Sequence, residues 1–293
     1  MERPDLIVAV DFGMAESGKY TIVQIIRSWF NVSGVAFACR RDNAWDIDVY
    51  RKWPGCDHEN ACKVPTRLLY DRGSSSPKLW GFHCQSEREE ESDDNSREKE
   101  KRWFKLLLDE KVLDNMGAPG SHADVKRWIT DFLHHIYIDF MNHVRNHAIL
   151  TPKEWRSANV EFVFSIPTTW ERQEIIEDFR KIIKDAGFGG EGRTNKIHPV
   201  TISLTEASAA AVCTFKDCPE PLKKDQSFIV CDAGGGTTVR FAAKLFLRTA
   251  NLFRRMFPFS MWWKPIRWAA QHWRSFFLLV VSVARPLQAR DHT

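Results

Sequence analysis

Short apolar runs that end in polar or glycine residues recur along the chain, and they have the length and composition of buried β-strands. The runs are LIVAV (6–10), SGVAFACR (33–40), VEFVFSIP (160–167), VTISL (200–204) and the opening of SFIVCDAGGGTT (227–238). We expect the second run to return antiparallel to the first as a hairpin. Between residues 45 and 80, the fragments WPG, KVPTRLLYD and KLWGF predict further short strands separated by turns.

Two longer stretches place apolar residues at the spacing of an amphipathic helix. Ser121 and Asp124 form a capping-box pattern at the start of the first helix. Its apolar positions are Val125, Ile129, Phe132, Ile136, Phe140 and Val144. Thr168 and Glu171 are predicted to cap the second helix, and Gly187 is predicted to end it. Its apolar positions are Ile175, Ile176, Phe179, Ile182 and Ile183. Strands that alternate with helices predict an α/β fold in which a mixed sheet is flanked by helices.

Two patterns that look like functional motifs have simpler interpretations. GFGGEG (187–192) matches the G-x-G-x-x-G fingerprint of dinucleotide-binding folds, but it follows a predicted helix rather than a strand, so we interpret it as a helix-ending loop. The first helix carries His134, His135, His143 and His147, and the last two are four residues apart, a spacing that can bind a metal ion. We favour histidines on the solvent side of this helix.

The composition is that of an ordinary globular protein, with 43% hydrophobic and 27% charged residues. The 293 residues fit about two domains or one large α/β domain. SEREEESDDNSREKEK (86–101) has no apolar face and is predicted to be a flexible charged loop.

The seven cysteines show no CxxC pair and no spacing typical of a zinc site, so we expect reduced thiols, no disulfides and a cytoplasmic protein. The N-terminus MERPDLIVAVDF lacks the basic flank, long apolar centre and cleavage site of a secretory signal. FFLLVVSVA, from Phe276, is the longest apolar run, and at nine residues it is too short to span a bilayer.

Two glycine-containing turns follow predicted buried strands, and each begins with an aspartate. The first is Asp11-Phe12-Gly13, and the second runs from Asp232 through three glycines to two threonines. Glycines let backbone N–H groups approach phosphate oxygens, and an acid at the end of a strand can hold Mg²⁺ through water. We expect Asp11 and Asp232 to end neighbouring strands whose turns point at the same magnesium-bound phosphates. The alternative for each loop is a glycine turn without a ligand.

Segments in the same order and spacing point to a known family. They are IVAVDFGM, SGVAFACR, RKWPG, KVPTRLLYD, WGF, WFKLLLD, DVKRWITDFL, VEFVFSIPTTW, IIKDAGF, ISLTEASAAAV and IVCDAGGGTT. In these segments the chain resembles the actin-like ATPase superfamily, and in particular the divergent heat-shock-protein-70-like proteins, over most of residues 5–238. The resemblance implies the actin-like ATPase (ribonuclease H-like) fold, with lobe one in residues 1–225 and the first strand and phosphate loop of lobe two in residues 226–238.

The resemblance also implies ATP and Mg²⁺ as ligands and a role for each matching residue. The first phosphate loop would hold Asp11 and Gly13, and the second Asp232, Gly234, Gly235, Gly236 and Thr237. Asp11 and Asp232 would hold the hydrated Mg²⁺. Glu206 would orient the attacking water or accept its proton, and Lys105 would contact the γ-phosphate. From the residues alone, Glu206 can also be an acid favoured by the dipole at a helix N-terminus.

The chain departs from the family between two copies of Ser-Gly. Removing residues 19–34 leaves DFGMAESGVAFACR, which has the spacing of the family's first phosphate hairpin. We therefore interpret these sixteen residues as an insertion, and our hypothesis is a translated intron. Glu16 adds a carboxylate beside the expected phosphates, where like charges repel.

Nothing in residues 239–293 resembles the family, and we attribute the change to a missed splice or a frameshift near Val239. From Arg240 onward the chain has ten Lys/Arg against one acidic residue, so with a net charge of +4 the first 239 residues carry about five negative charges. Four tryptophans lie among these basic residues (262, 263, 268 and 273). We expect a disordered or aggregation-prone terminus rather than a nucleic-acid-binding or membrane-binding segment.

The sequence as a whole favours an ATP-binding protein of the heat-shock-protein-70-like chaperone ATPase type, whose hydrolysis would be lost through truncation of lobe two. The alternative is a non-catalytic scaffold or partner-binding remnant of the same fold. Neither interpretation identifies a client protein or a co-chaperone.

Overall fold

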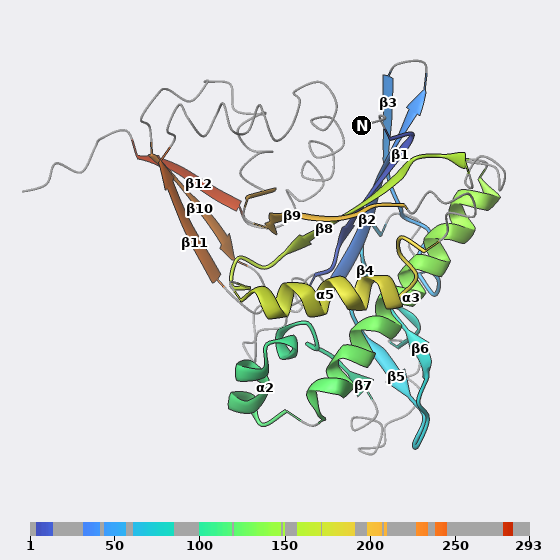
Figure 1. The fold of residues 1–293 in the computed structure, drawn as a ribbon, viewed down its shortest axis with the longest axis vertical. Coiled ribbons are helices and arrows are strands. Elements are labelled where there is room, and N and C mark those ends of the chain that lie inside the picture. The colour runs from blue at the N-terminus through green and yellow to red at the C-terminus, as the bar shows by residue number, and fades with distance from the viewer. Residues whose placement is uncertain are drawn as a thin grey trace, which may run out of the picture.

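The computed structural model describes the following residues of the chain: 4–13, 32–41, 44–56, 61–84, 100–118, 120–147, 149, 157–170, 172–190, 198–206, 208–209, 227–233, 238–244 and 278–283. These residues include a six-stranded sheet with the path β3-β2-β1-β8-β9, to which β4 is added through β2 (Figure 1). The strands are β1 (Leu6–Asp11), β2 (Val32–Arg41), β3 (Ala44–Val49), β4 (Val64–Pro65), β8 (Val160–Ile166) and β9 (Val200–Thr205). Each predicted apolar run that falls in this sheet forms a strand, which confirms those predictions.

The sheet is mixed, as the sequence predicts. β1 lies at its centre, antiparallel to β2, with Asp11 opposite Gly34, which confirms the predicted hairpin. On its other side β1 runs parallel to β8, and β8 runs parallel to β9. The carboxyl ends of β1, β8 and β9 therefore meet at one edge of the sheet, the edge at which open α/β sheets bind ligands.

The first predicted helix is α3 (His122–Asn146). Its capping box is present, because Ser121 Oγ accepts from the Asp124 backbone N–H and the Asp124 side chain accepts from the Ser121 backbone N–H. All six predicted apolar positions of this helix are buried. α3 is preceded by a short 3₁₀ helix, η2 (Leu106–Leu108), and by α2 (Glu110–Met116).

The second predicted helix is α5 (Gln173–Asp185), and it begins later than the capping pattern suggests. Arg172 is its N-cap and makes no capping bond, so the prediction for Thr168 is wrong, and Glu171 lies outside the described residues. The reason is a turn after Pro167, in which the Trp170 N–H donates to the Pro167 carbonyl at 3.1 Å. Gly187 follows the helix with a left-handed φ of 109°, which confirms the predicted helix end and the prediction that this glycine cluster begins as a helix-ending loop.

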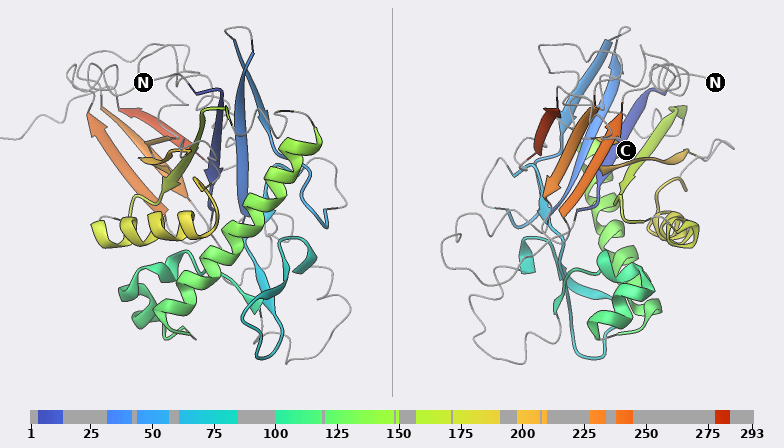
Figure 2. Two further views of the ribbon diagram at one scale, coloured as in Figure 1. Left: turned by 45° about the vertical axis from the view of Figure 1, so that its right-hand side comes forward. Right: turned by 90° about the vertical axis from the view of Figure 1, so that its left-hand side faces the viewer.

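Both helices pack on the same face of the sheet around aromatic side chains. The ring of Phe12 lies beside Phe132 of α3 and Phe179 of α5, with centroids 6.0 and 5.9 Å away. In the left view of Figure 2, α3 (green) runs diagonally past the strands and α5 (yellow) lies next to it. Alternate residues of β1 and β8 enter this core, so the period of two in each strand decides which side chains face the helices.

A small second sheet has the order β6-β5-β7. It consists of β5 (Leu68–Tyr70), β6 (Pro77–Trp80) and β7 (Glu100–Lys101). β7 corrects the boundary of the charged loop predicted over 86–101, because its last two residues form this strand. The Lys101 ammonium lies over the ring of Trp128 in α3, with Nζ 4.9 Å from the ring centroid. Residues 85–99 lie outside the described part of the chain.

A third sheet, with the order β11-β10-β12, is separate from the main one (Figure 1, orange to red). Its strands are β10 (Ser227–Ala233), β11 (Thr238–Lys244) and β12 (Leu278–Val283). The expectation that Asp11 and Asp232 end neighbouring strands is therefore wrong, because β10 pairs with β11 and β12 and not with β1. Of residues 239–293, predicted to be a disordered or aggregation-prone terminus, 239–244 belong to β11 and 278–283 form β12, and the rest lie outside the described residues.

The four histidines predicted to lie on the solvent side of α3 divide into two kinds. His134 and His147 are exposed, as predicted, whereas His135 stacks on Trp80 and His143 is half-buried. Burial lowers the pKa of His135 and lowers that of His143 to about 4, so both rings are neutral near pH 7. The prediction of solvent-side histidines is thus wrong for this second pair.

Asp139 of α3 gives the fold a pH-dependent contact. Its carboxylate accepts a hydrogen bond from the Tyr50 hydroxyl at 2.6 Å, and burial raises the pKa of Asp139 to about 6. Because the folded-state pKa lies above the unfolded value of 3.8, the stability from this group is present below that value and is lost as the pH rises through 6.

We expect Asp139→Asn to unfold at the same urea concentration as the wild type near pH 4, and at a higher concentration at pH 7.5, because the amide carries no charge to bury. Urea titrations followed by circular dichroism at both pH values measure this difference. His143, whose pKa is shifted in the opposite direction, is common to both proteins and cancels in the comparison. A difference that does not change with pH contradicts the assignment.

Candidate functional site

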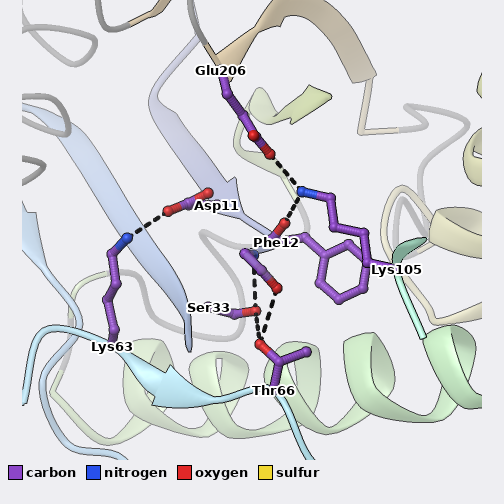
Figure 3. A network of polar contacts seen from close by, with 8 residues as sticks. Asp11, Phe12, Ser33, Lys63, Thr66, Lys105 and Glu206 are labelled. Atoms are coloured by element: carbon purple, nitrogen blue, oxygen red, sulfur yellow. Dashed lines mark hydrogen bonds and ion pairs between the residues drawn. The ribbon is translucent and has the colours of Figure 1, made fainter. Parts of the chain in front are cut away.

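Three residues predicted to act together are brought to the carboxyl-terminal end of β1 from distant parts of the chain. Asp11 ends β1, Lys105 precedes η2, and Glu206 directly follows β9. Lys105 Nζ donates to Glu206 Oε1 at 2.5 Å and also to the carbonyl oxygen of Phe12, the residue after Asp11 (Figure 3). The sequence alone places these residues up to 195 positions apart.

Lys105 is buried in a way that is unusual for a lysine. Its side chain is 2% exposed, and its ammonium lies 5.3 Å from the centroid of the Phe12 ring and 6.0 Å from that of Trp170. Trp103, two residues earlier, has a left-handed φ of 57°, which a non-glycine residue adopts at a cost. This turn starts the segment that carries Lys105 into the site, because the Leu106 N–H donates to the Trp103 carbonyl.

Glu206 stands at the start of a helical turn. Thr205 Oγ1 accepts from the Ser208 backbone N–H at 3.1 Å, which is the contact of an N-cap. The helix-dipole interpretation of Glu206 therefore has structural support, and so does its ion pair with Lys105. With 26% of its side chain exposed, the carboxylate reaches solvent while the lysine does not.

Asp11 has a partner that the sequence analysis did not identify. Lys63 Nζ lies 2.8 Å from Asp11 Oδ2, and the two side chains are 17% and 15% exposed. Lys63 lies in the segment KVPTRLLYD, immediately before β4. Its position in this segment gives no sign of the contact, because the contact depends on β4 pairing with β2 and β2 pairing with β1.

Gly13 is held by two buried hydroxyl groups. The Gly13 N–H donates to Ser33 Oγ at 3.2 Å, the Thr66 hydroxyl donates to the Gly13 carbonyl at 3.1 Å, and the two hydroxyls are 2.9 Å apart. With these donors assigned, the Ser33 hydroxyl donates to Thr66, and the three bonds close a ring (Figure 3). Sequence reasoning expected this N–H to approach a phosphate, but here it is bonded to Ser33. Thr66 was not predicted.

The second expected phosphate loop is only partly described. The backbone of Asp232 belongs to β10, but Gly234, Gly235, Gly236 and Thr237 lie outside the described residues. Most of the predicted insertion, 19–34, also lies outside them, although its last three residues belong to β2. The described site is therefore the first half of the predicted pair of loops.

The donor set of this site fits one class of ligand. Among the described residues, no group of three or more His, Cys, Asp or Glu side chains could hold a metal ion by itself. Proteins commonly hold Mg²⁺ through one or two carboxylates together with phosphate oxygens of a substrate. Asp11 and Glu206, each paired with a lysine, are therefore compatible with Mg²⁺ only where a phosphorylated ligand supplies further oxygens.

Comparison with protein-family models and with curated proteins finds no match for this chain. Cys39, Cys56, Cys62 and Cys84, the cysteines whose side chains are described, form no disulfide with one another. Among the described residues, no helix is both long and apolar enough to cross a bilayer.

Proposed function

We propose that the chain is an ATP-binding protein of the heat-shock-protein-70-like, actin-like ATPase type. One observation carries the proposal, namely the meeting of Lys105, Glu206 and the Asp11 turn at the carboxyl edge of the parallel strands. The family resemblance implies a role for each of these residues. Their proximity supports those roles, because a phosphate site needs its cation, its carboxylate and its glycine turn within reach of one another.

The roles follow from charge and burial. Lys105, held in a largely dry position, offers a fixed positive charge to phosphate oxygens, where a low dielectric strengthens the attraction. Glu206 reaches solvent and can accept a hydrogen bond from water, which orients that water toward the site. By the resemblance, Asp11 would hold Mg²⁺ through water and the ion would neutralise phosphate charge, and Asp232 would have to reach the same ion from a separate sheet, because β10 does not pair with β1.

Titration with fluorescently labelled ATP in Mg²⁺ tests the proposal. We expect saturable binding to the wild type, and we expect Asp232→Ala to weaken it by about tenfold or more, which corresponds to about 1.4 kcal/mol. Asp114→Ala, which removes an exposed carboxylate from α2, is the matched control and should bind as the wild type does. Equal affinity of Asp232→Ala and the wild type, or no binding to either, would overturn the proposal.

A non-catalytic scaffold is the second candidate, and one observation favours it. The charged groups of the site already pair with one another, Asp11 with Lys63 and Glu206 with Lys105. A site whose charges are balanced internally needs no bound anion for stability. A chain that unfolds cooperatively but binds no nucleotide in the titration above would support this candidate.

A further inference from the structure

Lys63 reaches Asp11 by crossing over β2 at a residue without a side chain. Gly34 is the register partner of Asp11 across the β1–β2 pair, and Ser33 beside it pairs with Val64, the residue after Lys63. A Cβ at Gly34 would lie 3.3 Å from Cγ and 3.8 Å from Cε of Lys63. The aliphatic stem of Lys63 therefore lies against the bare backbone of Gly34, and this path delivers the ammonium to the carboxylate.

The position of this ammonium matters because of what Asp11 is expected to hold. Both side chains are mostly buried, so their attraction is screened less than that of a surface pair. A cation that binds the Asp11 carboxylate has to share this carboxylate with the Lys63 ammonium or displace the ammonium. Lys63 also stays near enough to the first glycine turn to meet the phosphates of a nucleotide, because its partner Asp11 is two residues before Gly13.

We propose that the Lys63 ammonium is a permanent cation of the nucleotide site. At the Asp11 carboxylate it occupies much of the position that Mg²⁺ would otherwise occupy. The site then binds metal-free ATP nearly as well as Mg-ATP, because Lys63 and Lys105 together balance the phosphate charge. This inference rests on the proposed function and adds to it a weak dependence on the metal. It concerns binding, so no hydrolysis is needed to test it.

The experiment compares the dissociation constant of labelled ATP in EDTA with that in excess Mg²⁺, using fluorescence anisotropy on the full chain. For the wild type we expect a ratio below about 3, and for Lys63→Met a ratio of about 30 or more, since loss of a buried charge partner typically has an effect of this size. Lys63→Arg keeps the positive charge and should keep the low ratio. Lys111→Met, which removes an exposed lysine of α2, is the matched control.

Gly34→Ala is a second test that leaves every charge in place. The added methyl group would press on the Lys63 stem and on the Cys62 carbonyl, both 3.3 Å away, so Lys63 should reach Asp11 less well and the ratio should rise. This variant keeps the inference testable if Lys63→Met does not fold. Equal ratios in the wild type and both variants, or a wild type that binds ATP only with Mg²⁺, would overturn the inference and leave the proposed function standing. Absence of binding by the wild type in both conditions would instead overturn the proposed function, and the inference with it.

Discussion

Replacing Glu206 by alanine is expected to lower the free energy of unfolding by about 3 kcal/mol, because removing one partner of a buried ion pair leaves the other charge uncompensated. The charge left uncompensated is that of Lys105, whose side chain is 2% exposed and whose ammonium lies 2.5 Å from the Glu206 carboxylate in the wild type. The Phe12 carbonyl remains as an acceptor but carries no full charge. Urea unfolding followed by tryptophan fluorescence measures the change.

Replacing Lys105 instead of Glu206 should lower the free energy of unfolding much less. In Lys105→Met the buried charge is gone, a side chain of similar length fills the space, and Glu206 remains 26% exposed to water. We expect a loss of about 1 kcal/mol or less, from the bond to the Phe12 carbonyl. The double variant should then be close to Lys105→Met alone, which makes the two effects strongly non-additive.

The surface pair between Arg180 and Glu177 of α5, 3.6 Å apart, provides the control. Glu177→Ala should change stability by about 0.5 kcal/mol or less, because exposed ion pairs contribute little. Equal losses from Glu206→Ala and Lys105→Met that add up in the double variant would contradict the asymmetry expected of a buried charge. The asymmetry we expect is typical of a charge that is buried for a purpose other than stability.

The elements that sequence reasoning found are those with a strong local period. β1, β8 and α3 repeat apolar residues at two-residue or helical spacing, and their bounds differ from the predicted ones by a residue or two. The start of α5 was missed because the turn after Pro167 competes with the capping pattern. β12 was recognised only as an apolar run, because its partner strand β10 lies some fifty residues earlier in the chain and no local pattern links the two strands.

The site was predictable from the glycine turn after a buried strand, which singled out Asp11, and from the family resemblance, which singled out Lys105 and Glu206. Strand pairing between β1, β2 and β4 brings Lys63, Ser33 and Thr66 to the site, and this pairing cannot be recognised from the spacing of residues in the sequence. Hydroxyl groups such as these are also common in loops, so composition does not single them out.

Strand register gives the repeated Ser-Gly pair a structural meaning. Ser33 belongs to the ring around Gly13, and Gly34 makes room for Lys63 opposite Asp11. Removing residues 19–34 would place Ser17 and Gly18 directly before Val35, so the same two residue types would occupy the same two positions of β2. The insertion hypothesis is thus compatible with both contacts, because a shortened chain could form them again.

Replacing Phe12 by alanine is the second change with a large expected effect. We expect it to lower the free energy of unfolding by about 3–5 kcal/mol, as is typical when a fully buried aromatic ring is deleted. The ring is 0% exposed and lies 6.2, 6.0 and 5.9 Å from the centroids of Phe104, Phe132 and Phe179. These neighbours come from the Lys105 segment, α3 and α5, so the cavity would open where three elements meet the sheet. Such a site collapses poorly, because each wall is fixed by its own element.

Phe12→Leu separates loss of volume from loss of the aromatic contacts and should cost about 1–2 kcal/mol. Ile138→Ala on α3, where the side chain is 43% exposed, is the control and should change stability by about 0.5 kcal/mol or less. Urea unfolding at constant pH measures all three variants. If Phe12→Ala costs no more than Ile138→Ala, Phe12 does not hold the helices to the sheet, and the packing that positions Lys105 against the Asp11 turn must have another source.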